Sequence, residues 1–372
     1  MPVSLPDHLS HGKLKAEENN MNNLKYIFVH GLSGWGSYDE QYQKMPYWGM
    51  KDGDLMVRLK KEGFDCYAAS VHPSRSAYDR ACELFAQLTG RITDYGKVHS
   101  ERNGHEQYGP DFRNRPLIDK FDKDTRLVLV GHSFGGATIR TFAHLMAYGS
   151  PEETYVDNPL FRGGMADNIF AIVTVAAPHN GTTAYDMYED PSFDPKSIKI
   201  PLDEKIFNRF MNLNNSRNVP AIAREDLASY DMHIDNAMKL NEKLKVLENV
   251  YYFSQPCCST EDVNGIQVPI RKETEILYRR SSRIMGAYRG KTAGGMVIDE
   301  TWRPNDGLVN TLSAAYPLGQ PHKNFDPDNI EKGTWNVFET VKGDHMALQG
   351  GFFRRRNIFP YYLDLLKMID KL

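Results

Sequence analysis

The sequence lacks the features that direct a chain into a membrane or onto nucleic acid. No window approaches the run of about 18 apolar residues that a membrane-spanning helix needs. Its 45 basic and 48 acidic residues leave a formal net charge of only −3, so no field of one sign points to nucleic acid or an anionic membrane. These absences favour a small or neutral binding partner.

Cysteine and leader-like segments are also scarce. Four cysteines are too few to cross-link 372 residues, and Cys257 and Cys258 are neighbours that cannot easily pair with each other. We expect Cys66 and Cys82 to be buried thiols. The first 23 residues are polar, without the apolar core of a signal peptide, and predict an N-terminal extension over residues 1–24. We expect residues 25–372 to form one domain.

The most informative stretch covers residues 126–136, where an apolar run meets a Gly-x-Ser-x-Gly turn. Residues 127–130 predict a buried strand and residues 137–143 a helix, so the turn joins a strand to a helix. The two glycines lack Cβ atoms that would clash in so tight a bend, which lifts Oγ of Ser133 clear of the sheet and strains its backbone. This context favours a serine nucleophile; the alternative is an ordinary glycine-rich turn.

A second predicted strand, residues 26–29, runs directly into a His-Gly segment at residues 30–36. In α/β-hydrolases one backbone N–H of the oxyanion hole comes from the residue after the nucleophile, and another from a loop that follows an early strand. Here those donors would be the N–H groups of Phe134 and Leu32. A glycine turn with a structural histidine is the alternative.

The order of candidate residues selects an acid and a base, because in this fold the serine precedes the acid and the acid precedes the histidine. Asp306 lies in an Asn-Asp-Gly turn that can hold a carboxylate in a fixed position; the alternative is a plain turn residue. His345 follows a predicted last strand at residues 334–341 and is the predicted base. His322 lies in a loop with no strand before it, and His179 precedes every candidate acid, which predicts a structural role.

Asp79, His99 and His105 form a second group of candidate functional residues, which could ligate a metal ion. Carboxylate and neutral imidazole suit Zn²⁺ in a tetrahedral site. Asp79 is also expected to open a helix over residues 79–89, after a strand at 64–71, so a helix N-cap beside two surface histidines is the alternative.

The remaining patterns complete the predicted domain. Strands are expected at residues 169–175 and 249–254, and a closing helix at 361–372. Residues 184–230 are polar and interrupted by prolines, with a helical phrase at 206–212, which suits a lid over the serine pocket.

These motifs resemble the secreted bacterial lipases of thermophilic bacilli and staphylococci, together with related clostridial-type esterases, from about Tyr26 to the C-terminus. The segments that carry the resemblance are residues 30–36, 78–83, 93–96, 131–135, 177–183 and 305–310. The resemblance implies an α/β-hydrolase fold: a mostly parallel sheet with helices on both faces, a zinc-binding insertion at residues 73–115 and a lid at 184–230. It also implies secretion, and an acyl ester or lipid substrate met at an oil–water or solid interface.

The resemblance further implies a structural zinc ion, remote from the serine, held by Asp79, His99, His105 and Asp231.

Three departures from the family change what we expect of the pocket, of calcium binding and of the lid. Phe134 replaces a small or amide residue, which predicts a more apolar pocket rim. Residues 346–353 offer no acidic side chain, so calcium is not expected. The lid is shorter than in the family, which predicts an open cleft suited to esterase activity or to bulky, even polymeric, esters.

The predicted function is carboxylic ester hydrolysis through an acyl-enzyme on Ser133, as a lipase or an esterase. Two alternatives remain open: an acyltransferase or amidase that uses the same triad, and a non-catalytic α/β-hydrolase that acts as a binding module.

Overall fold

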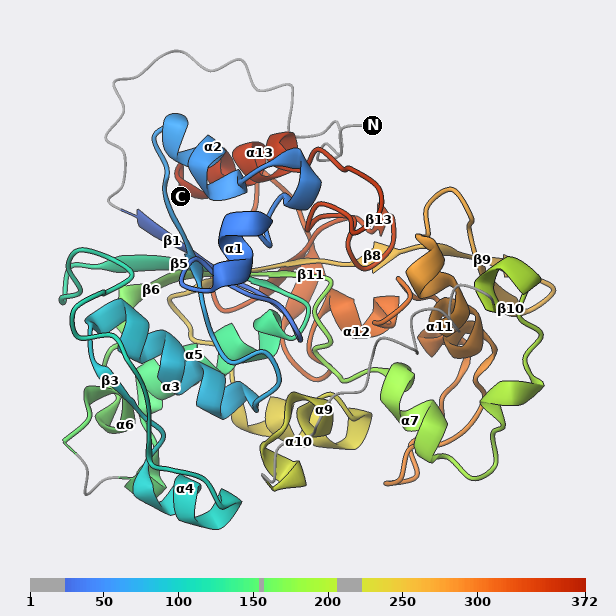
Figure 1. The fold of residues 1–372 in the computed structure, drawn as a ribbon, viewed down its shortest axis with the longest axis horizontal. Helices are drawn as coiled ribbons and strands as arrows, with labels where there is room; N and C mark the ends of the chain where they lie inside the picture. Colours follow the sequence, from blue (N-terminus) through green and yellow to red (C-terminus); the bar gives the residue numbers. More distant parts are fainter. Residues whose placement is uncertain (1–23, 154–156, 206–222) are drawn as a thin grey trace.

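A seven-stranded sheet forms the centre of the computed structural model, which describes residues 24–153, 157–205 and 223–372 (Figure 1). The strand order is β11-β12-β7-β6-β5-β1-β2, and all neighbouring strands are parallel. The strands are β1 (Leu24–Val29), β2 (Asp65–Ala69), β5 (Arg126–His132), β6 (Ile169–Val175), β7 (Tyr251–Gln255), β11 (His322–Asn324) and β12 (Trp335–Val337). The predicted mostly parallel α/β architecture is confirmed.

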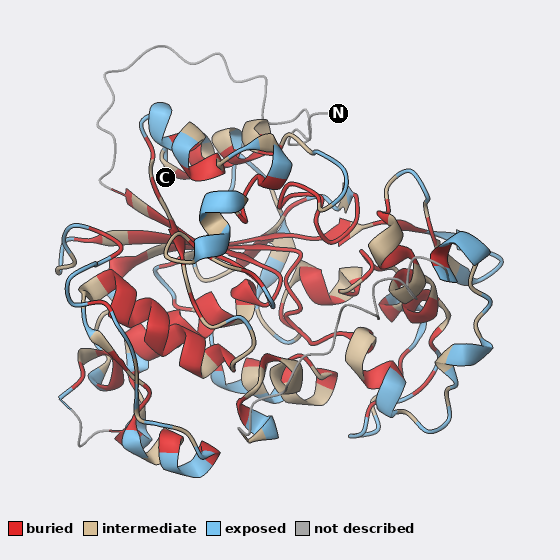
Figure 2. Cartoon of the chain, in the orientation of Figure 1, coloured by how far each residue is buried: buried red, intermediate tan, exposed pale blue. Residues whose placement is uncertain are grey.

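Helices cover both faces of this sheet, as Figures 1 and 2 show. Helices α2 (Leu55–Lys61) and α13 (Phe359–Ile369) pack on one face, and α3 (Ala77–Thr89) and α5 (Gly135–Tyr148) on the other. Because strand side chains alternate, β1 contributes to both cores: Phe28 faces the first pair of helices and Ile27 the second. The central strands β1, β5 and β6 are covered on both faces, which explains their nearly continuous apolar sequences, whereas the edge strand β11 is polar and largely exposed.

The other helices and strands connect and extend this framework. They are α1 (Glu40–Lys44), η2 (Met50–Asp52), β3 (Ile92–Asp94), α4 (Lys97–Asn103), β4 (Tyr108–Asp111), η3 (Pro151–Glu153), α6 (Pro159–Arg162), η4 (Ala166–Asn168), α7 (Thr183–Glu189), η5 (Pro195–Ser197), η6 (Arg224–Asp226), α9 (Ala228–Asp231), α10 (Ile234–Lys243), β8 (Cys257–Cys258), β9 (Thr260–Val263), β10 (Ile266–Pro269), α11 (Ile276–Ala287), η7 (Glu300–Trp302), α12 (Thr311–Ala315) and β13 (Val341–Lys342).

The strand predicted over residues 334–341 is wrong as one element. β12 pairs with β7 in the central sheet, whereas β13 pairs with β8 in a separate two-stranded sheet. Between them, Phe338 is buried against the rings of Phe253 and Phe325. The N–H of Phe338 still donates to the Ser254 carbonyl oxygen at 2.9 Å, so the break between the two strands falls at the polar residues Glu339 and Thr340.

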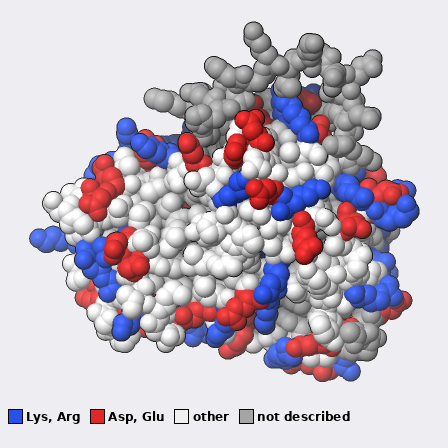
Figure 3. Space-filling model, turned by 180° about the vertical axis from the view of Figure 1, so that it is seen from behind, with Lys and Arg blue, Asp and Glu red and all other residues white. Residues whose placement is uncertain are grey.

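Other expectations agree with the structure within a few residues at element ends. All four cysteines are free, and Cys66 and Cys82 are buried as predicted. The helical phrase at residues 206–212 lies outside the described residues. In the described part of the chain, no helix combines the length and apolar character that crossing a membrane requires. On the face drawn in Figure 3, basic and acidic side chains are interspersed and separated by uncharged surface.

Candidate active site and metal cluster

Ser133 lies at a strained turn between β5 and α5. Its φ of 56° lies in the left-handed region, which is uncommon for a residue with a Cβ. A Cβ at Gly135 would lie 2.3 Å from the carbonyl oxygen of Val29, and one at Gly131 would lie 2.6 Å from the backbone of Gly135. Both glycines are therefore required for β5, β1 and α5 to meet this closely, and the predicted backbone strain is confirmed.

The His-Gly loop follows β1 and lies against the serine. A Cβ at Gly31 would be 2.7 Å from Cβ of Ser133, so the loop backbone directly contacts the turn. The guanidinium of Arg80, which is fully buried on α3, donates a hydrogen bond to the carbonyl oxygen of His30. The loop is thereby fixed immediately before Leu32, whose side chain borders the cavity in front of Ser133.

Phe134 does not make the pocket rim more apolar, so that expectation is wrong. Its ring is fully buried and packs with Ala77, Ala228 and Met232, while the Arg80 guanidinium lies 5.1 Å from the ring centroid. Only its backbone faces the serine turn, at the N-cap of α5. The phenylalanine thus anchors the turn to α3 and α9.

Asp306 and His345 form a buried hydrogen-bonded pair. Nδ1 of His345 lies 2.8 Å from Oδ2 of Asp306, while Oδ1 accepts from the N–H groups of Leu308 and Val309 at 2.9 and 2.7 Å. The His345 N–H also donates to the Asp306 carbonyl oxygen at 2.8 Å. These contacts fix both residues and leave Nε2 of His345 as the ring nitrogen that can act on a neighbouring group.

A cavity of about 590 Å³ brings Ser133, His345 and Leu32 together. Asp306 is fully buried and is absent from the described cavity lining. The apolar and aromatic side chains of the lining are Leu32, Trp35, Tyr47, Met50, Ala184, Tyr185, Met187, Tyr188, Met232, Leu277, Tyr278, Leu308, Val309, Met346 and Phe352. Such a cavity favours a substrate with an apolar chain attached to the reacting group.

The two rival histidines are found away from this cavity. His322 opens the short edge strand β11, so the expectation that it lies in a plain loop is wrong; its exposed ring stacks on Tyr316 at 3.5 Å between centroids. His179 is buried, with Nε2 2.9 Å from the hydroxyl of Thr174. Burial, and then the charge of Arg140, keep the pKa of His179 well below its ordinary value, as suits a neutral structural histidine.

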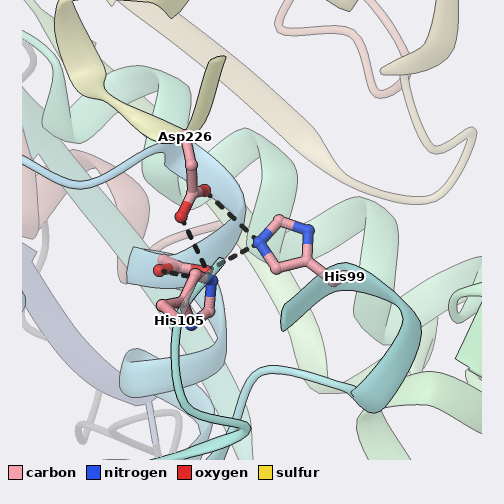
Figure 4. Close-up of side chains that lie close together, drawn as sticks. His99, His105 and Asp226 are labelled. Carbon is pink, nitrogen blue, oxygen red and sulfur yellow. Dashed lines mark hydrogen bonds and ion pairs between the residues drawn. The ribbon is translucent and has the colours of Figure 1, made fainter. Parts of the chain in front are cut away.

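A second polar site is formed by Asp79, His99, His105 and Asp226, whose ligand atoms lie within 4.8 Å of one another. Figure 4 shows that the side chains of His99, His105 and Asp226 converge on one point. The assignment of Asp231 to this group is wrong. Oδ2 of Asp231 instead accepts from the N–H of Ala77 at 2.8 Å, at the N-terminus of α3, and burial raises the pKa of this carboxyl group to about 7.

The geometry of this cluster fits a tetrahedral metal ion. Nε2 of His99 lies 2.9 Å from Asp79 and 3.3 Å from Asp226, and Nε2 of His105 lies 3.7 and 3.2 Å from the same two carboxylates. An ion with ligands at about 2.0–2.1 Å holds them about 3.3 Å apart. Nδ1 of His105 lies 2.9 Å from the Glu106 carbonyl oxygen, which directs the Nε2 lone pair into the cluster.

The charge balance also favours a cation. Burial opposes protonation of His99, but its hydrogen bonds to Asp226 and Asp79 outweigh burial and raise its pKa to about 9. Nε2 of His105 and Oδ2 of Asp226 are buried without a hydrogen bond among the described residues. The guanidinium of Arg75 already pairs with Asp79 at 2.6 Å, so a bound cation would chiefly balance the second buried carboxylate, Asp226.

Several residues of these sites were not predicted. Asp226 is chemically equivalent in sequence to Asp231, and only the fold decides between them. Arg80 directly follows Asp79, but nothing in the local pattern indicates that it reaches the carbonyl of His30. Tyr47 borders the cavity and bonds to Gly31, yet it lies in a segment without a catalytic motif.

The sheet is parallel, Ser133 lies on a strand-to-helix turn, and a buried Asp–His pair lies at the same cavity. This arrangement is typical of α/β-hydrolases. The model of the lipase-like, C-terminal domain family matches residues 22–196 and 204–356. The chain belongs to this family.

Named relatives agree with this assignment. The chain is 31% identical over 363 residues to a lipase of Staphylococcus hyicus, covering 90% of this chain and 54% of that protein, and 30% identical over 370 residues to lipase 2 of Staphylococcus aureus, covering 91% and 52%. It therefore spans about half the length of these curated relatives. Among solved structures, EstA from Clostridium botulinum matches with a TM-score of 0.80 at 28% identity, covering 100% of this chain and 91% of that chain. The S. hyicus lipase structure matches with a TM-score of 0.77 at 26% identity, covering 96% and 98%.

Proposed function

We propose that this chain is a serine carboxylic ester hydrolase, a lipase or esterase that acts through an acyl-enzyme. The observation that supports this most strongly is the apolar cavity on which Ser133 and His345 meet, with Asp306 bonded to the far side of the imidazole. The family membership and the lipase and esterase names of the relatives point to the same chemistry.

In the proposed mechanism, Oγ of Ser133 attacks the acyl carbon of the ester. Nε2 of His345 accepts the serine proton and returns it to the leaving alcohol, while Asp306 stabilises the imidazolium through Nδ1. The N–H groups of Leu32 and Phe134 donate to the tetrahedral oxyanion. Water then attacks the acyl carbon of the acyl-enzyme. His345 accepts a proton from this water and returns it to Oγ of Ser133 as the carboxylic acid leaves.

We further infer that residues 73–115 form a metal-binding insertion and residues 184–230 a lid within one domain. Asp79, His99, His105 and Asp226 would hold Zn²⁺, since two imidazoles and two carboxylates are suitable zinc ligands. When bound, zinc supplies charge neutralisation and cross-linking of the chain. Four protein ligands complete a tetrahedral shell, which is typical of a structural rather than a catalytic ion.

A series of p-nitrophenyl esters, from acetate to palmitate, tests the proposed function. We expect hydrolysis with a maximum at short or medium chains if the enzyme is an esterase, and at long chains if it is a lipase. An alkyl fluorophosphonate should label Ser133 in the wild type, detected by mass spectrometry, and leave Ser133→Ala unlabelled. Absence of both hydrolysis and labelling would reject the proposal, and ester formation with added alcohol in place of hydrolysis would make the enzyme an acyltransferase.

Gly31→Ala is expected to lower kcat by about 10²- to 10³-fold, the loss typical of one oxyanion donor. The new Cβ would lie 2.7 Å from Cβ of Ser133, so the loop and the N–H of Leu32 must shift away from the serine. Steady-state kinetics on the best ester measure the effect. Gly265→Ala is the control: the added Cβ meets no atom within 4 Å, so any cost of its positive φ falls on stability alone. Unchanged kcat in Gly31→Ala would contradict the assigned oxyanion loop.

A further inference from the structure

Three buried hydrogen bonds run in series behind the candidate catalytic residues. The N–H of Gly31 donates to Oη of Tyr47 at 3.1 Å, Oη of Tyr47 lies 2.7 Å from Nδ1 of His132, and Nε2 of His132 lies 2.8 Å from the carbonyl oxygen of His345. Tyr47, His132 and His345 are each at most 5% exposed. The series thus connects segments that are far apart in the sequence, and its two side chains are buried at the wall of the cavity in front of Ser133.

The chemistry of the partners fixes the direction of each bond. A carbonyl oxygen only accepts, so Nε2 of His132 must carry a hydrogen and donate to His345. The ring is neutral, because burial and then the charge of His345 lower the pKa of His132 to about 3. Nδ1 of His132 is consequently an acceptor, which receives the Tyr47 hydroxyl hydrogen and leaves the hydroxyl oxygen free to accept from Gly31.

Each end of the hydrogen-bond series lies next to a candidate catalytic or oxyanion-binding residue. Gly31 immediately precedes Leu32, His132 immediately precedes Ser133, and the final acceptor is the backbone of His345 itself. The segment around Tyr47 is also joined to the loop after His345, because the side-chain amide of Gln349 donates to the Tyr47 carbonyl and the Gly49 N–H donates to the Gln349 carbonyl at 2.9 Å.

We propose that Tyr47 and His132 are positioning residues that hold the oxyanion loop and the catalytic histidine at a fixed separation around Ser133. The inference rests on the proposed ester hydrolase function and deepens it. Neither side chain takes part in proton transfer. They hold the N–H donor of Leu32 and the imidazole of His345 at fixed positions relative to each other. These positions matter most in the transition state, where negative charge develops on the oxyanion and positive charge on the imidazole.

Tyr47→Phe removes the central hydroxyl and retains the ring with its packing on Trp35 and Trp48. It leaves the Gly31 N–H and Nδ1 of His132 buried without a hydrogen-bond partner. The oxyanion loop at Gly31 is then no longer tied to His132 and the backbone of His345, so the two can move independently. We expect kcat to fall about 10- to 100-fold, the range typical of supporting contacts around a site, with KM within about twofold.

Tyr252→Phe is the matched control. Tyr252 is also buried, 3% exposed, and its hydroxyl also accepts a backbone N–H, from Leu247 at 2.8 Å, but it lies on β7 away from the cavity. Both variants are expected to lose similar thermal stability, whereas only Tyr47→Phe should lose kcat. Equal kcat values in the two variants would overturn the proposal.

Two replacements of His132 each remove one of its two hydrogen bonds. His132→Asn keeps a side-chain acceptor near the Nδ1 position for Tyr47 but loses the donor to His345. His132→Gln keeps a donor to His345 near the Nε2 position but loses the acceptor for Tyr47. The downfield NMR signal of the His345 Nδ1 proton, bonded to Asp306, reports the ring position without requiring turnover. We expect the signal to shift or broaden most in His132→Asn, which loses the direct donor to His345, and less in Tyr47→Phe and His132→Gln, which break the bond between the two side chains. It should stay near its wild-type position in Tyr252→Phe.

The two proposals fail in different ways. A wild type that hydrolyses no ester would reject the proposed function, while the NMR comparison would still test the hydrogen-bond series. A wild type that hydrolyses esters, with unchanged kcat and unchanged His345 signal in Tyr47→Phe, would reject the positioning role and leave the function standing.

Discussion

Replacing His345 by alanine is expected to lower kcat for ester hydrolysis by about four to six orders of magnitude. Without the imidazole, no group accepts the Ser133 proton, and the hydroxyl is a weak nucleophile at neutral pH. The nucleophile and the base act as a unit, so Ser133→Ala combined with His345→Ala should cost little more than either change alone. Pre-steady-state release of p-nitrophenol measures both the acylation step and the residual rate.

His322→Ala provides the control for this experiment. His322 also follows Asp306 in the sequence, but its ring stacks on Tyr316 at the exposed edge of the sheet. Its loss should leave kcat and KM within about twofold of the wild type. If His322→Ala were as damaging as His345→Ala, or if His345→Ala kept most of the activity, the assignment of the base would be wrong.

Asp226→Asn is expected to weaken zinc binding by at least about 100-fold and to lower Tm by on the order of 3–5 °C in buffer that contains micromolar zinc. An amide cannot supply the negative charge that the second carboxylate contributes. Ligand binding to the folded state stabilises it by about 4 kcal/mol at a thousandfold excess over Kd, and a site weakened 100-fold loses about 2.7 kcal/mol of this contribution. Zinc stoichiometry by mass spectrometry and calorimetric Tm check both numbers.

Asp231→Asn distinguishes the two aspartates. Its side-chain oxygen can still accept from the N–H of Ala77, so the contact seen at the start of α3 is kept. We expect zinc stoichiometry to be unchanged, and chelation to lower Tm in this variant as in the wild type. Loss of zinc from Asp231→Asn with retention in Asp226→Asn would restore the assignment made from the family resemblance and reject the cluster geometry.

Local patterns predicted the features that depend on neighbouring residues. The strands at residues 26–29, 127–130 and 169–175 have continuous apolar sequences because both of their faces are covered by helices. The turn at Ser133 was predictable from its Gly-x-Ser-x-Gly pattern, since a Cβ at Gly131 would meet the backbone of the turn itself; the contact of Gly135 with Val29 of β1 is long-range and was not predicted. His345 and Asp306 required only the chain order of the fold, and the structure brings them to 2.8 Å.

Features that depend on distant contacts were missed. Asp226 and Asp231 have the same chemistry, and the packing of η6 and α9 against the start of α3 decides which carboxylate enters the cluster. Phe134 was expected at the pocket rim because sequence gives no indication that Ala77, Ala228 and Met232 enclose its ring. Tyr47 lies in a turn between short helices, and its role depends on a partner on β5.

The metal ligands are distributed very unevenly along the chain. Three come from the segment that includes α3 and α4, while Asp226 is separated from Asp79 by more than a third of the sequence. The complete ligand set therefore exists only after a long loop has closed, and an ion can be held by all four only late in folding. An interaction that forms after the folding transition state slows unfolding and leaves the folding rate nearly unchanged. The metal would thus set the lifetime of the native state more than the speed at which it is reached.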